Sequence, residues 1–405
     1  MDVITYGCAT NQADSEIILG LLREQGLGDE DIVVVNTCTV KSPTENKIQK
    51  RLGQLRGKKV VVAGCIPAAR ESIIEEYPEY SFIGVNTQDV VEAVRETVKG
   101  HRYVNIAASN DKSCLPRKRI NPFVGILPIS EGCLGACSYC QTRNARKNLR
   151  SYPMQKLVSE VTSMCEDGVN QIWVTSQDTG CYGKDTGENI VDLLKAICDV
   201  EYDFKVRVGM MNPEHALMHA DELLKVFESE KLYRFLHIPV QSGDDGVLDD
   251  MNRDYNAKDY IKLTEKFSGF TISTDVICGY PTESEEAFNK TIKIVEETKP
   301  DIVNISRYWP RPGTKASEQK SLPGSLTKAR SRKMNEAFKR IGLEKNRQWI
   351  GWGGHALVSS ANPDGTLTAR NDWYKPIIVE GSCLGDKIRV RVEDATYYDL
   401  RGVLV

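Results

Sequence analysis

Residues 124–140, VGILPISEGCLGACSYC, decide the fold, because an apolar run leads directly into three closely spaced cysteines. Cys133, Cys137 and Cys140 follow the spacing Cys-x3-Cys-x2-Cys. Three thiolates on one short loop can hold three irons of a [4Fe–4S] cluster and leave the fourth iron open to another ligand. A structural zinc ion would need a fourth ligand, and no cysteine or histidine follows closely enough to supply one locally. The spacing therefore predicts an iron–sulfur cluster.

The open iron indicates the kind of chemistry. The amino and carboxylate groups of S-adenosylmethionine (SAM) can chelate such an iron, and one-electron reduction then releases a 5′-deoxyadenosyl radical. Tyr139 lies inside the cysteine loop, where its ring could pack beside the adenine of SAM or simply cover the cluster.

Strand patterns recur after this loop, and helical patterns separate them. The strands are VGILPIS, NQIWVTS, FKVRVGM, RFLHIPV, FTISTDVICG and DIVNISRY, between about residues 122 and 340. Repeated strand–helix units of this kind predict a complete or partial α/β barrel, and a doubly wound open sheet is the alternative.

The first hundred residues show a shorter version of the same alternation, which predicts an N-terminal parallel sheet covered by helices. Cys8, Cys38 and Cys65 each come just after a strand of this sheet. Because the carboxyl ends of parallel strands share one edge, the three thiols should converge there. A second cluster is our interpretation, and three separate buried cysteines are the alternative.

The rest of the chain divides into a linker and a third domain. Residues 101–121 are polar and read as a linker, while short β segments after residue 343 predict a small all-β barrel of a kind that often binds nucleic acid. We therefore expect domains at 1–105, 120–342 and 343–405.

Composition restricts the class further. The chain has 405 residues and a formal net charge of −3, so it is not a basic nucleic-acid binder as a whole. It has no apolar run of the ~18 residues that a membrane span needs, and no secretory signal. We expect a cytoplasmic protein, in which twelve cysteines indicate metal or redox chemistry rather than disulfides.

Several signatures together resemble one known family. They are TYGCATNQADSE, VNTCTVKSPTENK and AGCIP in the first domain, and EGCLGACSYC, TSQDTGCYGKD, HIPVQSGDDGVLDDMNRDY, TDVICGYPTE and RPGTKAS in the second. Over essentially its whole length the chain resembles the methylthiotransferases, which are radical SAM enzymes with two [4Fe–4S] clusters. Its C-terminal barrel is similar to a TRAM domain, a tRNA-binding module.

The resemblance also implies a substrate. CTVKSPTE, GCIP and CQTRNARKNLRSYP are similar to the archaeal and eukaryotic branch, which adds a methylthio group at C2 of N6-threonylcarbamoyladenosine at position 37 of tRNA. The expected partners are then a tRNA anticodon stem-loop and a one-electron donor such as a flavodoxin or ferredoxin, with no membrane anchor. The alternatives are methylthiolation of isopentenyl-adenosine or of a ribosomal protein aspartate, and a non-catalytic iron–sulfur scaffold that binds RNA.

The resemblance assigns roles to individual residues. Cys133, Cys137 and Cys140 correspond to ligands of the radical SAM cluster, and Cys8, Cys38 and Cys65 to ligands of the auxiliary cluster. The six other cysteines match no ligand position and should be structural, with Cys165 and Cys198 in the core. The residues expected to contact SAM are Tyr139, Gln177, Asp178, Arg207, Gln241, Ser242, Gly243, Asp275 and Gly279.

Two basic segments are candidates for tRNA contact, although a charge run is more often a solvated helix face. Arg143 or Arg146 could also meet the carboxylate of the threonylcarbamoyl group, and Trp373 and Tyr374 could stack on bases. The basic candidates are Arg143, Arg146, Lys147 and Arg150, and then Arg311, Lys315, Lys320, Lys328, Arg330, Arg332, Lys333, Arg340, Lys345 and Arg347.

Overall fold

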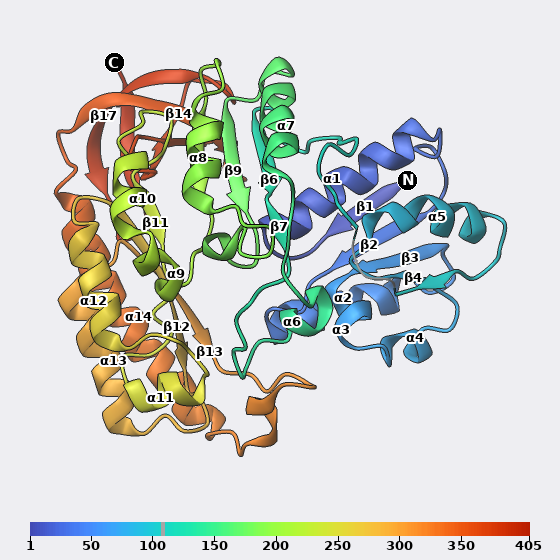
Figure 1. Ribbon diagram of the computed structural model, residues 1–405, viewed down its shortest axis with the longest axis horizontal. Helices are drawn as coiled ribbons and strands as arrows, with labels where there is room; N and C mark the ends of the chain where they lie inside the picture. Colours follow the sequence, from blue (N-terminus) through green and yellow to red (C-terminus); the bar gives the residue numbers. More distant parts are fainter. Residues whose placement is uncertain (107–109) are drawn as a thin grey trace.

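The structure, a computed structural model, describes residues 1–106 and 110–405. Three parts follow one another along the chain, and the N-terminal and C-terminal parts lie on opposite sides of the central one (Figure 1).

The N-terminal part is a parallel sheet with strand order β1-β2-β3-β4-β5. β2 and β3 are buried along their whole length and consist largely of valine, as expected for strands covered on both faces. Helices α1 and α5 pack on one face, and α2 packs on the other. The strands are β1 (Asp2–Thr5), β2 (Val33–Thr37), β3 (Val60–Gly64), β4 (Ser81–Ile83) and β5 (Val104–Asn105), and the helices α1 (Ala9–Glu24), α2 (Ser42–Gln54), α3 (Cys65–Ala69), α4 (Ile73–Glu76) and α5 (Val90–Val98).

The central part is an open half-barrel of two parallel three-stranded sheets, ordered β10-β9-β6 and β11-β12-β13. A single bridge from Val206 to Leu232 joins them. The strands are β6 (Val124–Pro128), β9 (Gln171–Thr175), β10 (Lys205–Val208), β11 (Phe235–His237), β12 (Thr271–Cys278) and β13 (Ile302–Arg307). Around them lie α7 (Met154–Glu166), α8 (Ile190–Cys198), α9 (Pro213–Met218), α10 (Ala220–Val226), α11 (Asp245–Asp250), α12 (Ala257–Lys266), α13 (Glu285–Thr298) and α14 (Gly324–Arg347). Of the complete and partial α/β barrels that the sequence predicts, the structure has the partial one.

The C-terminal part is a closed barrel with strand order β14-β15-β16-β18-β17. Its strands are β14 (Gly353–Ala361), β15 (Leu367–Arg370), β16 (Pro376–Val379), β17 (Lys387–Ala395) and β18 (Leu400–Leu404). Helix α14 runs through the expected boundary at 342 and packs against this barrel. Gly342 permits the contact, because a Cβ there would lie 2.5 Å from the carbonyl oxygen of Tyr397.

The segment expected to be a linker contributes to the fold. β5 pairs with β4 and extends the N-terminal sheet, and the side chain of Lys112 is buried. Polar composition suggested a solvated connection, but these polar groups have partners inside the molecule. Residues 107–109 of this segment lie outside the described residues.

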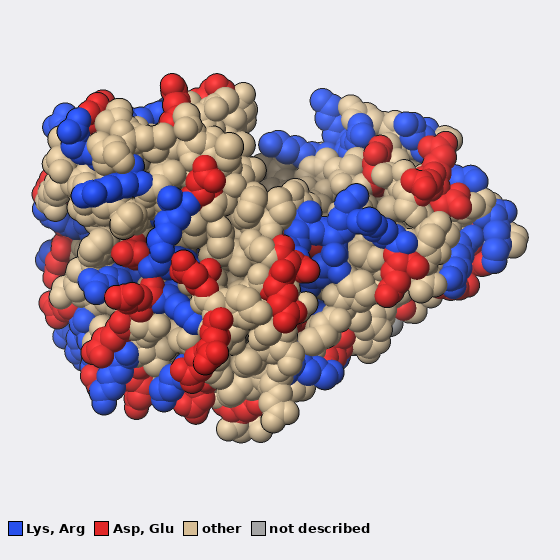
Figure 2. Space-filling view, turned by 90° about the horizontal axis from the view of Figure 1, so that it is seen from above, with Lys and Arg blue, Asp and Glu red and all other residues tan. Residues whose placement is uncertain are grey.

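Figure 2 shows basic and acidic side chains interspersed over much of the face seen from above, with a notch between the N-terminal part at the right and the rest.

Among the helices that the structure describes, none has both the length and the hydrophobicity needed to cross a membrane.

Candidate active site

The loop that carries Cys133, Cys137 and Cys140 follows β6 and the short strand β7 (Ser130–Glu131). A Cβ on Gly135 would lie 3.4 Å from Cys133 Sγ and 3.7 Å from Cys137 Sγ, so two of the sulfurs surround one point. Burial, and then the neighbouring Cys137 thiolate, raises the pKa of Cys140. The backbone N–H of Gly135 donates to Cys133 Sγ at 3.2 Å. Three gathered thiols with an N–H donor fit a [4Fe–4S] cluster.

Two residues near this loop were not assigned to the site from the sequence. The guanidinium of Arg253 donates to Cys137 Sγ at 3.0 Å. A hydrogen bond with the thiol of Cys181 lowers the pKa of Cys133. Cys181 lies in the TSQDTGCYGKD signature and Arg253 in the HIPVQSGDDGVLDDMNRDY signature, so both signatures mark the region. Neither shows that its residue reaches the cysteine loop, because Arg253 is 116 positions from Cys137.

Asp178 supports Arg253 through Asn212. Its carboxylate is fully buried and accepts from the side-chain amide of Asn212 at 2.6 Å and pairs with Nδ1 of His215 at 2.8 Å. The amide oxygen of Asn212 in turn accepts from Arg253. The structure thus places Asp178 behind the loop, where it fixes other polar groups.

A cavity of about 220 Å³ opens beside the loop and brings together Tyr139, Gln241 and Asp275, three of the residues expected to contact SAM. Gln241 adopts a left-handed backbone conformation, with φ of 61°. Among the described residues, its Oε1 atom and the hydroxyl of Tyr308 are buried without a hydrogen-bond partner. Unpartnered buried polar atoms in a cavity wall indicate a polar ligand.

Asp275 is charged in this cavity. Burial alone would raise the pKa of its carboxyl, but hydrogen bonds from His237 and Asn304, together with the charge of Lys41, lower it overall. The His237 contact is 3.2 Å long and the Asn304 contact 2.9 Å.

The remaining expected SAM contacts lie elsewhere. Gln177 accepts from the backbone N–H of Gly132 at 2.8 Å, and Arg207 lies over the ring of Phe235. Ser242 and Gly243 pack against Thr291 of α13, and Gly279 packs against Thr327 of α14.

The N-terminal thiols also gather at one place. Cys8 precedes α1, Cys38 follows β2 and Cys65 follows β3, so all three lie at the carboxyl edge of the sheet. Sγ of Cys8 and Sγ of Cys65 lie 3.6 and 3.9 Å from Oδ1 of Asn11. Glycine is required at position 7 for two reasons. A Cβ there would lie 2.9 Å from Cys38 Sγ, and the backbone has a positive φ of 119°. Burial raises the pKa of Cys38 to about 11. This donor set fits a second iron–sulfur cluster.

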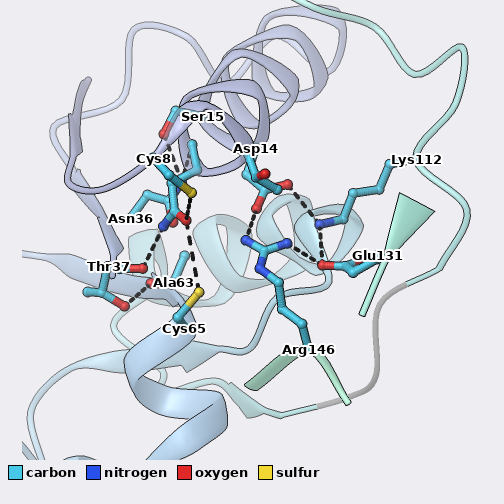
Figure 3. A network of polar contacts seen from close by, with 12 residues as sticks. Cys8, Asp14, Ser15, Asn36, Thr37, Ala63, Cys65, Lys112, Glu131 and Arg146 are labelled. Atoms are coloured by element: carbon cyan, nitrogen blue, oxygen red, sulfur yellow. Dashed lines mark hydrogen bonds and ion pairs between the residues drawn. The ribbon is translucent and has the colours of Figure 1, made fainter. Parts of the chain in front are cut away.

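Four buried charges hold the N-terminal part against the central part (Figure 3). Arg146, in helix α6 (Thr142–Arg146), pairs with Asp14 at 2.7 Å and with Glu131. Lys112 pairs with the same two carboxylates, at 2.7 and 3.2 Å. Burial raises the pKa of the Cys65 thiol, and the nearby charge of Arg146 opposes this rise. The expectation that Arg146 contacts tRNA is therefore wrong, because its side chain is only 1% exposed and has its partners inside the protein.

The cavity is lined by residues of both cysteine loops. Its wall includes Cys140 from the central loop and Thr39, the residue after Cys38. The hydroxyl of Thr39 donates to the side chain of Gln141, and Arg311 donates to the carbonyl oxygen of Thr39 at 2.6 Å. Both cysteine loops therefore face one space.

Several residues expected to bind tRNA have partners within the protein. Arg330 pairs with Glu283 at 2.8 Å, and Arg311 pairs with Glu45 at 2.8 Å. Tyr374 is buried and packs against the ring of Tyr233. Arg340, Lys345 and Trp373 also have partners, in Glu296, Asp301 and the carbonyl oxygen of Gly269. Of the cysteines expected in the core, Cys165 is buried and Cys198 is partly buried.

Comparisons with known proteins agree with this arrangement. Residues 127–295 match the Radical SAM superfamily, residues 355–405 match the TRAM domain, and residues 1–84 match an uncharacterized protein family, UPF0004. A solved radical S-adenosylmethionine methyltransferase, TsrM from Kitasatospora setae, has a similar fold, with a TM-score of 0.58 and 14% identity over 78% of this chain and 76% of that one.

Two full-length relatives carry a more specific name. The "Probable threonylcarbamoyladenosine tRNA methylthiotransferase" of Archaeoglobus fulgidus is 40% identical over 99% of this chain and 97% of its own length. The threonylcarbamoyladenosine tRNA methylthiotransferase of Homo sapiens is 36% identical over 98% of this chain and 72% of its own length. Given this identity along the whole chain, the protein belongs to the family of the threonylcarbamoyladenosine tRNA methylthiotransferases.

Proposed function

We propose that this protein is an enzyme that replaces the C2 hydrogen of N6-threonylcarbamoyladenosine at position 37 of tRNA with a methylthio group. The observation that carries the proposal is the cavity whose wall is formed by both cysteine loops, through Cys140 of the central loop and Thr39, the residue after Cys38. The reaction has two needs, a reagent that can remove an unactivated hydrogen and a sulfur held next to the same carbon. Two cluster sites facing one space meet both needs.

The family uses SAM and [4Fe–4S] clusters as cofactors. When bound, these groups supply the radical that removes the hydrogen, and the sulfur and methyl group that replace it. In our proposal, Cys133, Cys137 and Cys140 hold the radical SAM cluster. A second cluster is held by Cys8, Cys38 and Cys65.

The protein's own part is to bind, orient and exclude water. Tyr139, Gln241 and Asp275 line the cavity and would contact SAM there. Asp178 acts indirectly, because it positions Asn212 and through it Arg253. The other expected SAM contacts pack against neighbouring helices or strands, so we give them positioning roles.

The substrate reaches the site as an unpaired base. An anticodon-loop nucleotide can leave its stack at less cost than one in a helix. The TRAM barrel is the proposed tRNA-binding module. The anticodon stem-loop as binding element, the cytoplasmic location and a flavodoxin or ferredoxin as electron donor stay predictions.

The test compares three tRNAs that differ only at position 37: one with threonylcarbamoyladenosine, one with adenosine and one with isopentenyl-adenosine. We expect methylthio product, measured by mass spectrometry of digested nucleosides, only from the first. Equal product from the first two, or product only from the third, would reject the substrate and leave the radical chemistry standing.

A further inference from the structure

A second cleft adjoins the reaction cavity and is lined by three cations. It has a volume of about 380 Å³ and lies between the start of α2, the end of β13 and α14. Lys41, Arg307 and Arg332 line it, and none of them makes an ion pair with any residue that the structure describes. Nearby Arg311 and Arg330, by contrast, each pair with a glutamate. Cations left without carboxylate partners in one cleft indicate a site for an anion.

An exposed tryptophan stands at the junction of the two spaces. Trp309 is 38% exposed and lines both the cleft and the cavity. The guanidinium of Arg307 lies 5.0 Å from the centre of the Trp309 ring. An aromatic face beside cations is a common surface for a nucleobase with a charged group.

The two spaces adjoin each other. Lys41, Ser306, Arg307 and Trp309 belong to the walls of both, and the cavity extends from them to Cys140. In adenine, C2 and the N6 substituent flank N1 on one edge of the base. A base whose C2 faces the thiols therefore holds its N6 substituent on the same edge, where the adjoining cleft can receive it, whereas its phosphates lie on the sugar side.

We propose that Lys41, Arg307 and Arg332 form an oxyanion site that takes the carboxylate of the threonylcarbamoyl group. This inference rests on the proposed function and adds the residues that select the substrate. Planar guanidinium groups match a carboxylate with two parallel hydrogen bonds, which gives direction as well as charge. A backbone phosphate presents similar oxygens, so the test must separate the two sources.

The test measures binding of two anticodon stem-loops, one with threonylcarbamoyladenosine and one with adenosine at position 37, without reductant and at one salt concentration. For the variant with Arg307→Gln and Arg332→Gln, we expect about a tenfold or larger loss of affinity for the modified stem-loop. Its affinity for the unmodified stem-loop should change less than about twofold. Lys41→Gln should act in the same direction. The control is Lys293→Gln, an exposed charge on α13 outside the cleft, which should change neither affinity.

Equal losses for both stem-loops would assign the cations to phosphate and overturn the proposal, as would no loss for either. Turnover by the wild-type enzyme separates this failure from a failure of the proposed function. If the wild type methylthiolates the modified tRNA but the variant loses both affinities equally, only the oxyanion site is rejected. If the wild type does not prefer the modified tRNA in either assay, both proposals are rejected.

Discussion

Arg253 shows that part of the cluster environment comes from outside the cysteine loop. Its side chain is almost fully buried, and its guanidinium contacts Cys137 Sγ while Asn212 holds it from the other side. Hydrogen bonds and positive charge at cluster sulfurs stabilise the additional electron of the reduced state. Arg253 should therefore keep the cluster easier to reduce than the thiolates alone would.

Replacement of Arg253 by methionine should lower the midpoint potential of the radical SAM cluster by on the order of tens of millivolts. The measurement is a redox titration followed by electron paramagnetic resonance, in protein that lacks the N-terminal thiols so that one cluster gives the signal. Arg207→Gln is the control, because that guanidinium lies over the ring of Phe235 and not at a thiol. An unchanged potential in the Arg253 variant would show that the contact has no electronic effect.

At the scale of elements, α1, β7 and α6 are joined by the four buried charges of Asp14, Glu131, Lys112 and Arg146. Removing one partner of such a network leaves a buried charge unpaired, which costs about 3–5 kcal/mol. Arg146→Met should therefore lower the free energy of unfolding by roughly that amount. It should also reduce iron bound at the N-terminal thiols, because the charge of Arg146 opposes the burial that raises the pKa of the Cys65 thiol. The matched control is Arg143→Met, an exposed arginine one turn earlier on the same helix, which should leave both quantities unchanged.

The same network makes the stability of the protein depend on pH. Burial would raise the pKa of Asp14, but the charges of Lys112 and Arg146 lower it overall. A lowered pKa in the folded state means that Asp14 contributes stability above its ordinary value of about 3.9, and that this contribution is lost as pH falls through the folded value. Without Arg146 the pKa of Asp14 rises, so the acid unfolding midpoint of Arg146→Met should move to higher pH. A circular dichroism titration measures it, and an unmoved midpoint would contradict the account.

Elements were predictable from the sequence where burial makes a continuous pattern. β2 and β3 are valine runs buried along their whole length. The six central strands are predictable as apolar stretches between helical patterns, although β10 and β13 are only partly buried. β5 was missed because it is a two-residue edge strand in a polar segment. The ends of strands were harder to interpret. Asp275 lies within β12 and faces the cavity, whereas Gly279 comes just after the strand ends at Cys278, has a positive φ of 80° and packs on α14. No local pattern in the sequence shows where the strand ends.

Contacts with tRNA were hard to predict from runs of basic residues for a similar reason. The sequence shows that Arg146 and Arg330 lie in basic stretches, but it does not show that Asp14 and Glu283 reach them from distant positions. The two cysteine groups were easier to predict. Local spacing marks the central group. The N-terminal group is marked by its position after successive strands, because these strand ends share one edge of a parallel sheet.

At the scale of the whole molecule, the TRAM barrel is anchored in the base of the half-barrel. Tyr374 packs between Tyr233 and Phe235, with ring centres 4.9 and 5.0 Å away. Lys375 pairs with Asp301 at 2.7 Å, and both side chains are buried. Deletion of the barrel would therefore uncover part of the central core, so point variants separate tRNA binding from stability more cleanly than truncation.

Tyr374→Ala should cost about 3–5 kcal/mol of stability, as truncation of a buried aromatic side chain usually does. Chemical denaturation followed by tryptophan fluorescence measures this loss. Tyr398→Ala provides the control, because Tyr398 is on the same barrel and is 67% exposed. Equal effects of the two substitutions would show that the barrel does not depend on this contact.

In our proposal the N-terminal and central parts each hold one cluster, and the last prediction concerns the iron that they bind. Two groups of three thiols should bind about eight irons per chain in anaerobically reconstituted protein. Replacing Cys133, Cys137 and Cys140 by alanine should leave about half the iron and abolish formation of 5′-deoxyadenosine, because the open iron that binds SAM is lost. Replacing Cys8, Cys38 and Cys65 should also leave about half the iron but spare SAM cleavage, while methylthio product disappears. The two variants are controls for each other, since each keeps the site that the other lacks. Wild-type iron content in either variant would show that those thiols hold no cluster, and product formation without the N-terminal thiols would remove the role of the second site.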